Sequence, residues 1–72
     1  MSGSEIIKGF RKHGVTPYEL AELADISSGF LYTVEQNKKD LGFKSRMKIL
    51  RSEGLAKKYP KAVEWFKTVV LN

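Results

Sequence analysis

Two short helix-forming segments follow each other closely in residues 16–39, "TPYELAELADISSGFLYTVEQNKK". Thr16 followed by Pro17 predicts the start of the first segment, because a Thr hydroxyl can cap free amides and proline is tolerated at the first helical position. Ser27 is the corresponding cap of the second segment. Isolated helices shorter than about 12 residues are marginal in water. The two segments must therefore pack against each other and against the rest of the domain.

A helix is also predicted before this pair. Ser4 can cap it, and apolar residues at helical spacing, Phe10 among them, form its buried side. Gly14 is expected to end it. At the end of the second paired segment, Asn37 is well placed for the left-handed backbone conformation that closes many helices.

A fourth helix is predicted from the spacing of Phe43, Met47 and Leu50 at i, i+4 and i+7, with Ile49 widening the apolar stripe. Gly54 is expected to end this helix. All three residues of the repeat are thereby expected to face the core.

Pro60 can begin a fifth helix whose stripe consists of Tyr59, Val63, Phe66 and Val70. Five helices account for nearly every large apolar residue, and no alternating strand pattern of useful length is present. The sequence therefore predicts one compact all-α domain of five helices over residues 1–72.

Size and cysteine content limit the possible functions. A chain of 72 residues without cysteine has little surface to bury in a deep substrate cleft and no thiolate for a disulfide or zinc site. A cytoplasmic, non-membrane protein is the simplest expectation, because the apolar runs are far shorter than a bilayer span. Residues 1–4 could be disordered or a remnant of cloning.

The net charge of +5 is unevenly distributed. Residues 38–61 contain nine Lys and Arg residues against two Asp and Glu residues, whereas residues 1–37 contain three basic and five acidic ones. A basic half of this kind favours a polyanionic partner such as nucleic acid or an anionic membrane surface. The alternative is a solvated lysine-rich surface that keeps the protein soluble.

Two short helices joined by a tight turn form a helix-turn-helix, whose second helix can enter a DNA major groove. From Gly14 to Lys39 the chain resembles the helix-turn-helix family of lambdoid phage repressors and Cro proteins. The segments "MKIL" and "KYPKAVEWF" are similar to the fourth and fifth helices of some temperate-phage immunity repressors. The resemblance implies a lambda-repressor-like fold and places the small side chain of Ala21 where the two helices cross. The apolar pattern of the motif is matched by Leu20, Ala24, Ile26, Leu31 and Val34.

The chain departs from that family at several positions. Pro17 stands where the family often has a Gln that contacts a phosphate, and Asp25 stands where the turn usually has Gly. In many relatives the residue matching Glu35 pairs with an Arg of the first helix. That position here is Phe10, so Arg11 is expected to substitute.

Helical geometry and the resemblance place four residues on the outward face of the recognition helix. Without a bidentate side chain among them, sequence readout would rest on hydroxyls, thymine methyl contact and DNA shape. The alternative is that these residues only cap and cover the helix. The predicted base-reading residues are Ser28, Gly29, Tyr32 and Thr33, and the predicted phosphate-contacting residues are Gln36, Lys38, Lys39 and Lys44.

The last helix is rich in apolar residues on two adjoining faces. Because one small domain has few places to cover them all, part of this surface is expected to form a homodimer interface. The alternative is that the helix packs entirely on its own domain. The predicted interface residues are Trp65, Phe66, Val69 and Val70, and Leu71 belongs to the same surface.

Other chemistry has little support in the sequence. His13 is the only histidine and sits near a helix end, where an interaction with the helix dipole explains it. Glu19 and Glu22 are interpreted as solvated surface. No cofactor, metal or catalytic activity is expected. The sequence predicts specific binding to double-stranded DNA by a transcriptional regulator, in the manner of a phage or prophage repressor. The alternatives are a protein-interaction module or an antitoxin, and a protein that compacts nucleic acid without sequence specificity.

Overall fold

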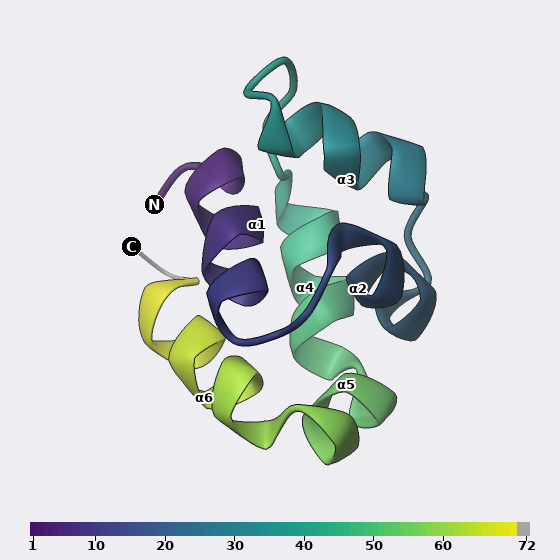
Figure 1. Ribbon diagram of the computed structural model, residues 1–72, viewed down its shortest axis with the longest axis vertical. Coiled ribbons are helices and arrows are strands. Elements are labelled where there is room, and N and C mark those ends of the chain that lie inside the picture. Colours follow the sequence, from purple (N-terminus) through teal and green to yellow (C-terminus); the bar gives the residue numbers. More distant parts are fainter. Residues whose placement is uncertain (71–72) are drawn as a thin grey trace.

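The computed structural model describes residues 1–70, which form six helices and no strand (Figure 1). The predicted all-α class is confirmed, whereas the predicted number of five helices is wrong. The longest helices have ten residues, and none in this part of the chain is long and apolar enough to cross a membrane. The helices are α1 (Gly3–Lys12), α2 (Pro17–Ala24), α3 (Ser28–Glu35), α4 (Phe43–Arg51), α5 (Glu53–Lys58) and α6 (Pro60–Val69).

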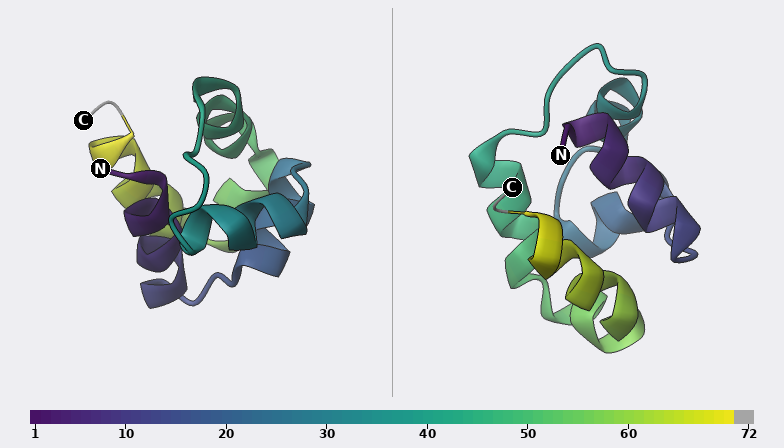
Figure 2. Two further views of the ribbon diagram at one scale, coloured as in Figure 1. Left: turned by 90° about the horizontal axis from the view of Figure 1, so that it is seen from above. Right: turned by 90° about the vertical axis from the view of Figure 1, so that its left-hand side faces the viewer.

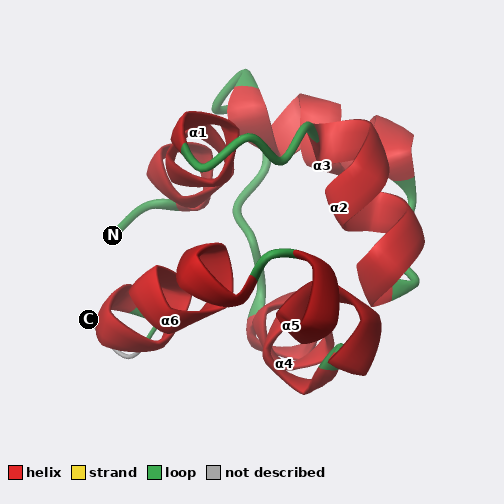
Figure 3. Cartoon of the chain, turned by 60° about the horizontal axis from the view of Figure 1, so that its bottom comes forward, coloured by secondary structure: helices red, strands yellow, loops and turns green. Residues whose placement is uncertain are grey.

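The helices form two groups of three. Helices α1, α2 and α3 lie on one side, and α4, α5 and α6 lie on the other, joined by the loop of residues 36–42 (Figure 3). Helix α2 packs against α3, α4 and α5, and α1 packs against α3. Helix α1 also lies beside α6, where the Phe10 ring contacts the rings of Trp65 and Phe66 (Figure 2). The core fills the space between the groups, and its largest fully buried side chains include Phe10, Phe66, Ile6, Leu20, Leu31, Ile49 and Leu55.

Helix α1 begins two residues earlier than predicted. The Ser2 hydroxyl accepts a hydrogen bond from the Glu5 amide, and the Glu5 carboxylate accepts one from the Ser2 amide, which together form a capping box. Ser4, the predicted cap, is instead buried, and its hydroxyl donates to the Glu35 carbonyl at 2.7 Å. Gly3 is buried as well. Residues 2–4 are thus part of the packed domain.

The other predicted helix starts and ends in the first half of the chain are confirmed. Thr16 accepts from the Glu19 amide, and Ser27 accepts from the Phe30 amide. Residues with a left-handed backbone follow each of the first three helices, where such residues close the last turn. They are Gly14 at φ 82°, Asp25 at φ 57° and Asn37 at φ 63°.

The prediction that Gly54 ends the fourth helix is wrong. Helix α4 ends at Arg51, and Ser52 both follows α4 and caps α5 by accepting from the Leu55 amide. The same hydroxyl donates to the Leu23 carbonyl at 2.6 Å. Gly54 lies inside α5. Because Ser52 caps α5 and is also bonded to the Leu23 carbonyl, the chain forms two helices, α4 and α5, where one helix ending at Gly54 was predicted.

The predicted core face of α4 is also corrected. Phe43 is 72% exposed, Met47 and Leu50 are only partly buried, and Ile49 is fully buried. A helix turns by about 100° per residue, so Phe43 lies about 120° around the axis from Ile49. The side of α4 that meets the core is therefore centred on Ile49, which leaves Phe43 at the surface.

Ala21 is 3% exposed on α2, which packs against α3. We expect Ala21→Leu to overpack this contact and to lower the free energy of unfolding by about 1–3 kcal/mol. Urea denaturation followed by circular dichroism measures the change. Glu22→Leu adds the same side chain at the next, exposed position and should change stability by less than about 0.5 kcal/mol. Equal stability of Ala21→Leu and the parent would contradict close packing at this position.

Candidate nucleic-acid interface

One side of α3 is free of core contacts. Leu31 and Val34 are fully buried on the inner side of the helix, whereas Tyr32 is 40% exposed and Gly29 is exposed. Ser28 and Thr33 are partly exposed. The structure therefore places all four predicted base-reading residues where a partner can reach them.

The Thr33 hydroxyl already has a partner within the helix. Its Oγ1 donates to the Gly29 carbonyl at 2.9 Å. The hydroxyl proton is thus used, while the oxygen lone pairs remain able to accept. A direct contact of Thr33 with a base would accept a hydrogen bond, or would use the Thr methyl group.

The fold itself does not require glycine at position 29. A methyl group there would have Ser27 Oγ as its nearest neighbour, at 3.7 Å, and the backbone is helical without a positive φ. Glycine in the middle of a helix costs roughly 0.5–1 kcal/mol relative to alanine, and for Gly29, the second residue of α3, this is an upper limit. Gly29 therefore weakens α3 for no structural gain in this domain, which favours a role in the close approach of a partner.

The end of α3 carries three of the predicted phosphate contacts. The Asn37 amide donates to the Val34 carbonyl at 2.9 Å, and the Lys38 amide donates to the Thr33 carbonyl at 3.2 Å. With Asn37 in the left-handed conformation, these bonds form a Schellman motif. The motif fixes the backbone at Lys38 relative to the helix. Gln36, Lys38 and Lys39 are exposed, and so is Lys44 in the first turn of α4.

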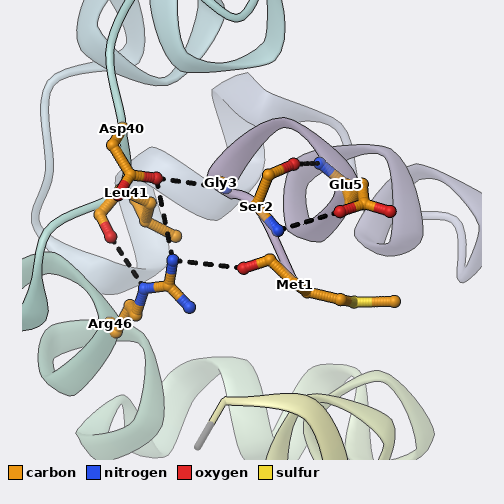
Figure 4. Close-up of polar contacts among 7 residues, drawn as sticks. All are labelled: Met1, Ser2, Gly3, Glu5, Asp40, Leu41 and Arg46. Carbon is orange, nitrogen blue, oxygen red and sulfur yellow. Dashed lines mark hydrogen bonds and ion pairs between the residues drawn. The ribbon is translucent and has the colours of Figure 1, made fainter. Parts of the chain in front are cut away.

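Residues 40–46 connect this loop to the start of the chain (Figure 4). The Gly3 amide donates to Asp40 Oδ1 at 3.3 Å. Arg46 donates through Nε to the Leu41 carbonyl at 2.7 Å and through Nη2 to the Met1 carbonyl at 3.4 Å. Its guanidinium also lies 3.7 Å from Asp40 Oδ1. We call this set of contacts the Arg46 clamp; no pattern in the sequence predicts it.

The clamp leaves the loop lysines without a counter-charge. Within residues 1–70 the ion pairs are Arg11–Glu35, Arg46–Asp40 and Lys58–Glu19. Asp40, the acidic residue next to Lys39 in the chain, is thus engaged by Arg46. Lys38 and Lys39 therefore present charge without an ion-pair partner just after α3, and Lys44 does so in the first turn of α4.

The predicted pairing of Arg11 with Glu35 is confirmed. Arg11 Nε lies 2.5 Å from Glu35 Oε2, and Arg11 Nη2 lies 3.0 Å from Oε1. The hydrogen bond to Glu35 raises the pKa of Arg11. Together with the Ser4 hydroxyl on the Glu35 carbonyl, the pair joins the end of α3 to α1.

The interpretation of Glu19 as solvated surface is wrong. Its carboxylate accepts from the Tyr59 hydroxyl at 2.5 Å and from Lys58 Nζ, so it ties α2 to the end of α5. These hydrogen bonds lower the pKa of Glu19 below its usual value, and the bond from Lys58 has the larger effect. Its partners lie about forty residues further along the chain, a separation at which the sequence gives no pairing signal.

His13 belongs to the packing of α1. It follows the last turn of α1, its Nδ1 lies 2.9 Å from the Gly9 carbonyl, and its ring stacks on Trp65 with centroids 5.3 Å apart. Across residues 1–70, no group of three His, Cys, Asp or Glu side chains is placed to hold a metal ion.

Helix α6 is covered more completely than predicted. Phe66 is fully buried and Val70 is 8% exposed, so both belong to the core of their own domain. Trp65 and Val69 are partly buried against that core. Of the four predicted interface residues, Phe66 and Val70 are thus corrected to core residues, whereas Trp65 and Val69 stay predictions, and Leu71 lies outside the described residues. The exposed large apolar side chains are Met1, Tyr18, Tyr32 and Phe43.

Comparison with known proteins gives no family assignment. No protein-family model matches the chain, and no curated protein or solved structure matches it significantly. The candidate interface is thus defined by the structure alone, and it consists of the outer face of α3 and the loop that follows it, which carries Lys38 and Lys39.

Proposed function

We propose that this protein binds double-stranded DNA sequence-specifically and regulates transcription by occupying an operator, as phage and prophage repressors do. The observation that carries the proposal is the accessible side of α3 beside a loop whose lysines have no counter-charge. Double-stranded DNA matches both parts, because a helix fits its major groove and cations neutralise its phosphates. The proposed activity needs no cofactor and no catalytic group, and the proposed location is the cytoplasm.

In this proposal α2 and α3 are the two helices of a helix-turn-helix. The connection of residues 25–27 is short, Asp25 provides its left-handed residue, and the helices pack against each other. Helix α3 is then the recognition helix. The pair Arg11–Glu35 supports this role, since it holds α3 at a fixed angle to α1.

Base reading and phosphate contact are assigned to different residues. The outer face of α3, with Ser28, Gly29, Tyr32 and Thr33, faces the base edges. Its hydroxyls and aromatic ring give weaker discrimination than a bidentate Arg, Asn or Gln, so DNA shape has a large share in the readout. Gln36, Lys38, Lys39 and Lys44 meet the phosphates and fix the register.

We further propose that the protein acts as a homodimer on a roughly palindromic operator. Two recognition helices about 34 Å apart would reach successive major grooves. Because Phe66 and Val70 are used internally, the contact on α6 would involve Trp65 and Val69. Sedimentation at tens of micromolar, with and without DNA, measures the assembly; a monomer in both conditions would contradict the dimer.

Selection of bound sites from random duplex DNA at two salt concentrations tests the proposed function. We expect an enriched motif, and binding that weakens steeply with salt. Tyr32→Ala should alter the enriched motif, because Tyr32 belongs to the reading face. Tyr18→Ala removes a tyrosine from α2 that is even more exposed than Tyr32 and should leave the motif unchanged. Absence of any enriched motif at both salt concentrations would contradict sequence-specific binding.

A further inference from the structure

A groove lies between the end of α2 and the outer side of α4. Its volume is about 490 Å³. Leu23, Ala24 and Met47 line it with apolar surface, and Phe43 stands at its edge. None of the residues assigned to base reading lines the groove, and of the residues assigned to phosphate contact only Lys44 does, so the groove adjoins the candidate DNA interface and shares that one lysine with it.

Ala24 is buried in the core, and Leu23 and Met47 pack partly against it, so the fold accounts for these three residues. It does not account for the exposed Phe43 side chain. Helix α4 packs on the core through Ile49, whereas Phe43 is 72% exposed. A large, exposed aromatic side chain beside an apolar groove is typical of a protein contact surface. Met47 suits such a surface, because its unbranched thioether side chain adapts to different partners.

The groove is also strongly basic. Lys44, Lys48 and Arg51 line it from α4 at i, i+4 and i+7, so they follow one side of the helix. Within residues 1–70 none of the three forms an ion pair with a carboxylate. Lys48 Nζ donates to the Asp25 backbone carbonyl at 3.2 Å, which leaves its other N–H groups available. Among the described residues, Asp25 is the only acidic one that lines the groove.

We propose that this groove binds an acidic amphipathic segment of a partner protein. The apolar side chains of that segment would cover Leu23 and Met47 and meet the Phe43 ring, while its carboxylates would pair with the cations of α4. This is the helix-in-groove mode of recognition, with charge deciding the partner. The inference goes beyond DNA binding, because it assigns the domain a protein partner at a surface that shares only Lys44 with the proposed DNA interface.

The charge pattern disfavours the two other occupants. In a two-fold contact between copies, the same surface meets itself, so the three cations would face their own counterparts. A DNA backbone would satisfy the cations and gain nothing from the apolar lining. An acidic segment with apolar anchors uses both properties of the groove.

Fluorescence anisotropy with a labelled synthetic peptide tests the proposal. The probe is an amphipathic helix with Leu and Phe on one side and Glu on the other, and a peptide with the same composition in scrambled order is its control. We expect Arg51→Glu to weaken binding of the probe on the order of tenfold or more. Phe43→Ala, which changes no charge, should also weaken it measurably. Lys67→Glu makes the same charge change on the exposed side of α6 and should have little effect.

The same variants separate this proposal from the proposed DNA binding. Phe43→Ala should bind duplex DNA like the parent, and Lys38→Ala with Lys39→Ala should bind the peptide like the parent. Peptide binding that is insensitive to Phe43→Ala but lost in the double lysine variant would overturn the proposal in favour of unspecific attraction to polyanions. If Phe43→Ala weakened DNA binding as much as it weakened peptide binding, the groove would be assigned to the DNA interface. A concentration-dependent mass abolished by Phe43→Ala would assign it to a second copy, and no preference for the probe over its scrambled control would reject it outright.

Discussion

Replacing Lys38 and Lys39 together with alanine should weaken binding to all duplexes by a similar factor and leave the preferred sequence unchanged. Each lysine that meets a phosphate releases counterions, so its removal reduces the slope of log K against log salt by about one. The double variant should therefore lose about two units of slope. Titration of a fluorescent duplex at several salt concentrations measures both the affinity and the slope.

A matched control for this variant is Lys57→Ala with Lys61→Ala. It removes the same charge from exposed positions of α5 and α6, at the opposite end of the domain from α3 (Figure 1). We expect it to leave the slope nearly unchanged. A double variant at positions 38 and 39 that shifts the preferred sequence, with an unaltered slope, would reverse the proposed division between phosphate contact and base reading.

The same substitution, glycine to alanine, should have opposite effects on stability at Gly9 and Gly29. A methyl group at Gly9 would overlap the six-membered ring of Trp65, which is held between Phe10 and His13. Overpacking of this kind costs about 1–3 kcal/mol. At Gly29, in the first turn of α3, the methyl group meets no close atom, so improved helix propensity should stabilise the protein by at most roughly 0.5–1 kcal/mol. Urea denaturation followed by Trp65 fluorescence measures both changes.

DNA binding then gives Gly29→Ala a second readout. If glycine is present so that the DNA major groove can approach α3 closely, the stabilised variant should bind DNA more weakly than the parent. A variant that is more stable and binds equally well would contradict that role for Gly29. A Gly9→Ala protein with parental stability would show that Trp65 is free to move, against the packing seen between α1 and α6.

Local sequence signals predicted the first half of the chain well. Thr16, Ser27, Asp25 and Asn37 act through hydrogen bonds and backbone angles within a few residues of themselves, so their roles can be inferred from neighbouring residues alone. The all-α class follows from the same signals together with apolar spacing. Nothing distant is needed to recognise these caps and turns.

The wrong predictions concern residues whose role is set by a contact with a residue far away in the sequence. Ser4 has the right chemistry for a cap, but the Glu35 carbonyl takes its hydroxyl, and Ser2 caps instead. Gly54 is a common helix end, yet Ser52 ends α4 because its hydroxyl serves α5 and the Leu23 carbonyl. Phe43 fits an apolar stripe, but the contact of α4 with the core is centred on Ile49.

The residues of the candidate site were predicted from the sequence, but the hydrogen bonds that fix the loop after α3 were not. Spacing on a helix is enough to place Tyr32 and Gly29 outward, and the pairing of Arg11 with Glu35 followed from a family resemblance. The Arg46 clamp could not be foreseen, because its acceptors include the backbone carbonyls of Met1 and Leu41. Backbone atoms carry no residue-specific signal in a sequence.

The Arg46 clamp has a consequence for the entropy of association. Fixing the backbone of one residue costs about 1–2 kcal/mol of conformational free energy at 25 °C. Because the Schellman motif at Asn37 and the bonds to Asp40, Leu41 and Met1 already hold residues 37–41, this cost is met when the chain folds. A polyanion that reaches the loop would have to immobilise little more than the side chains of Lys38 and Lys39. The loop is thus preorganised, and the contact can form at the first encounter without a slow rearrangement of the backbone.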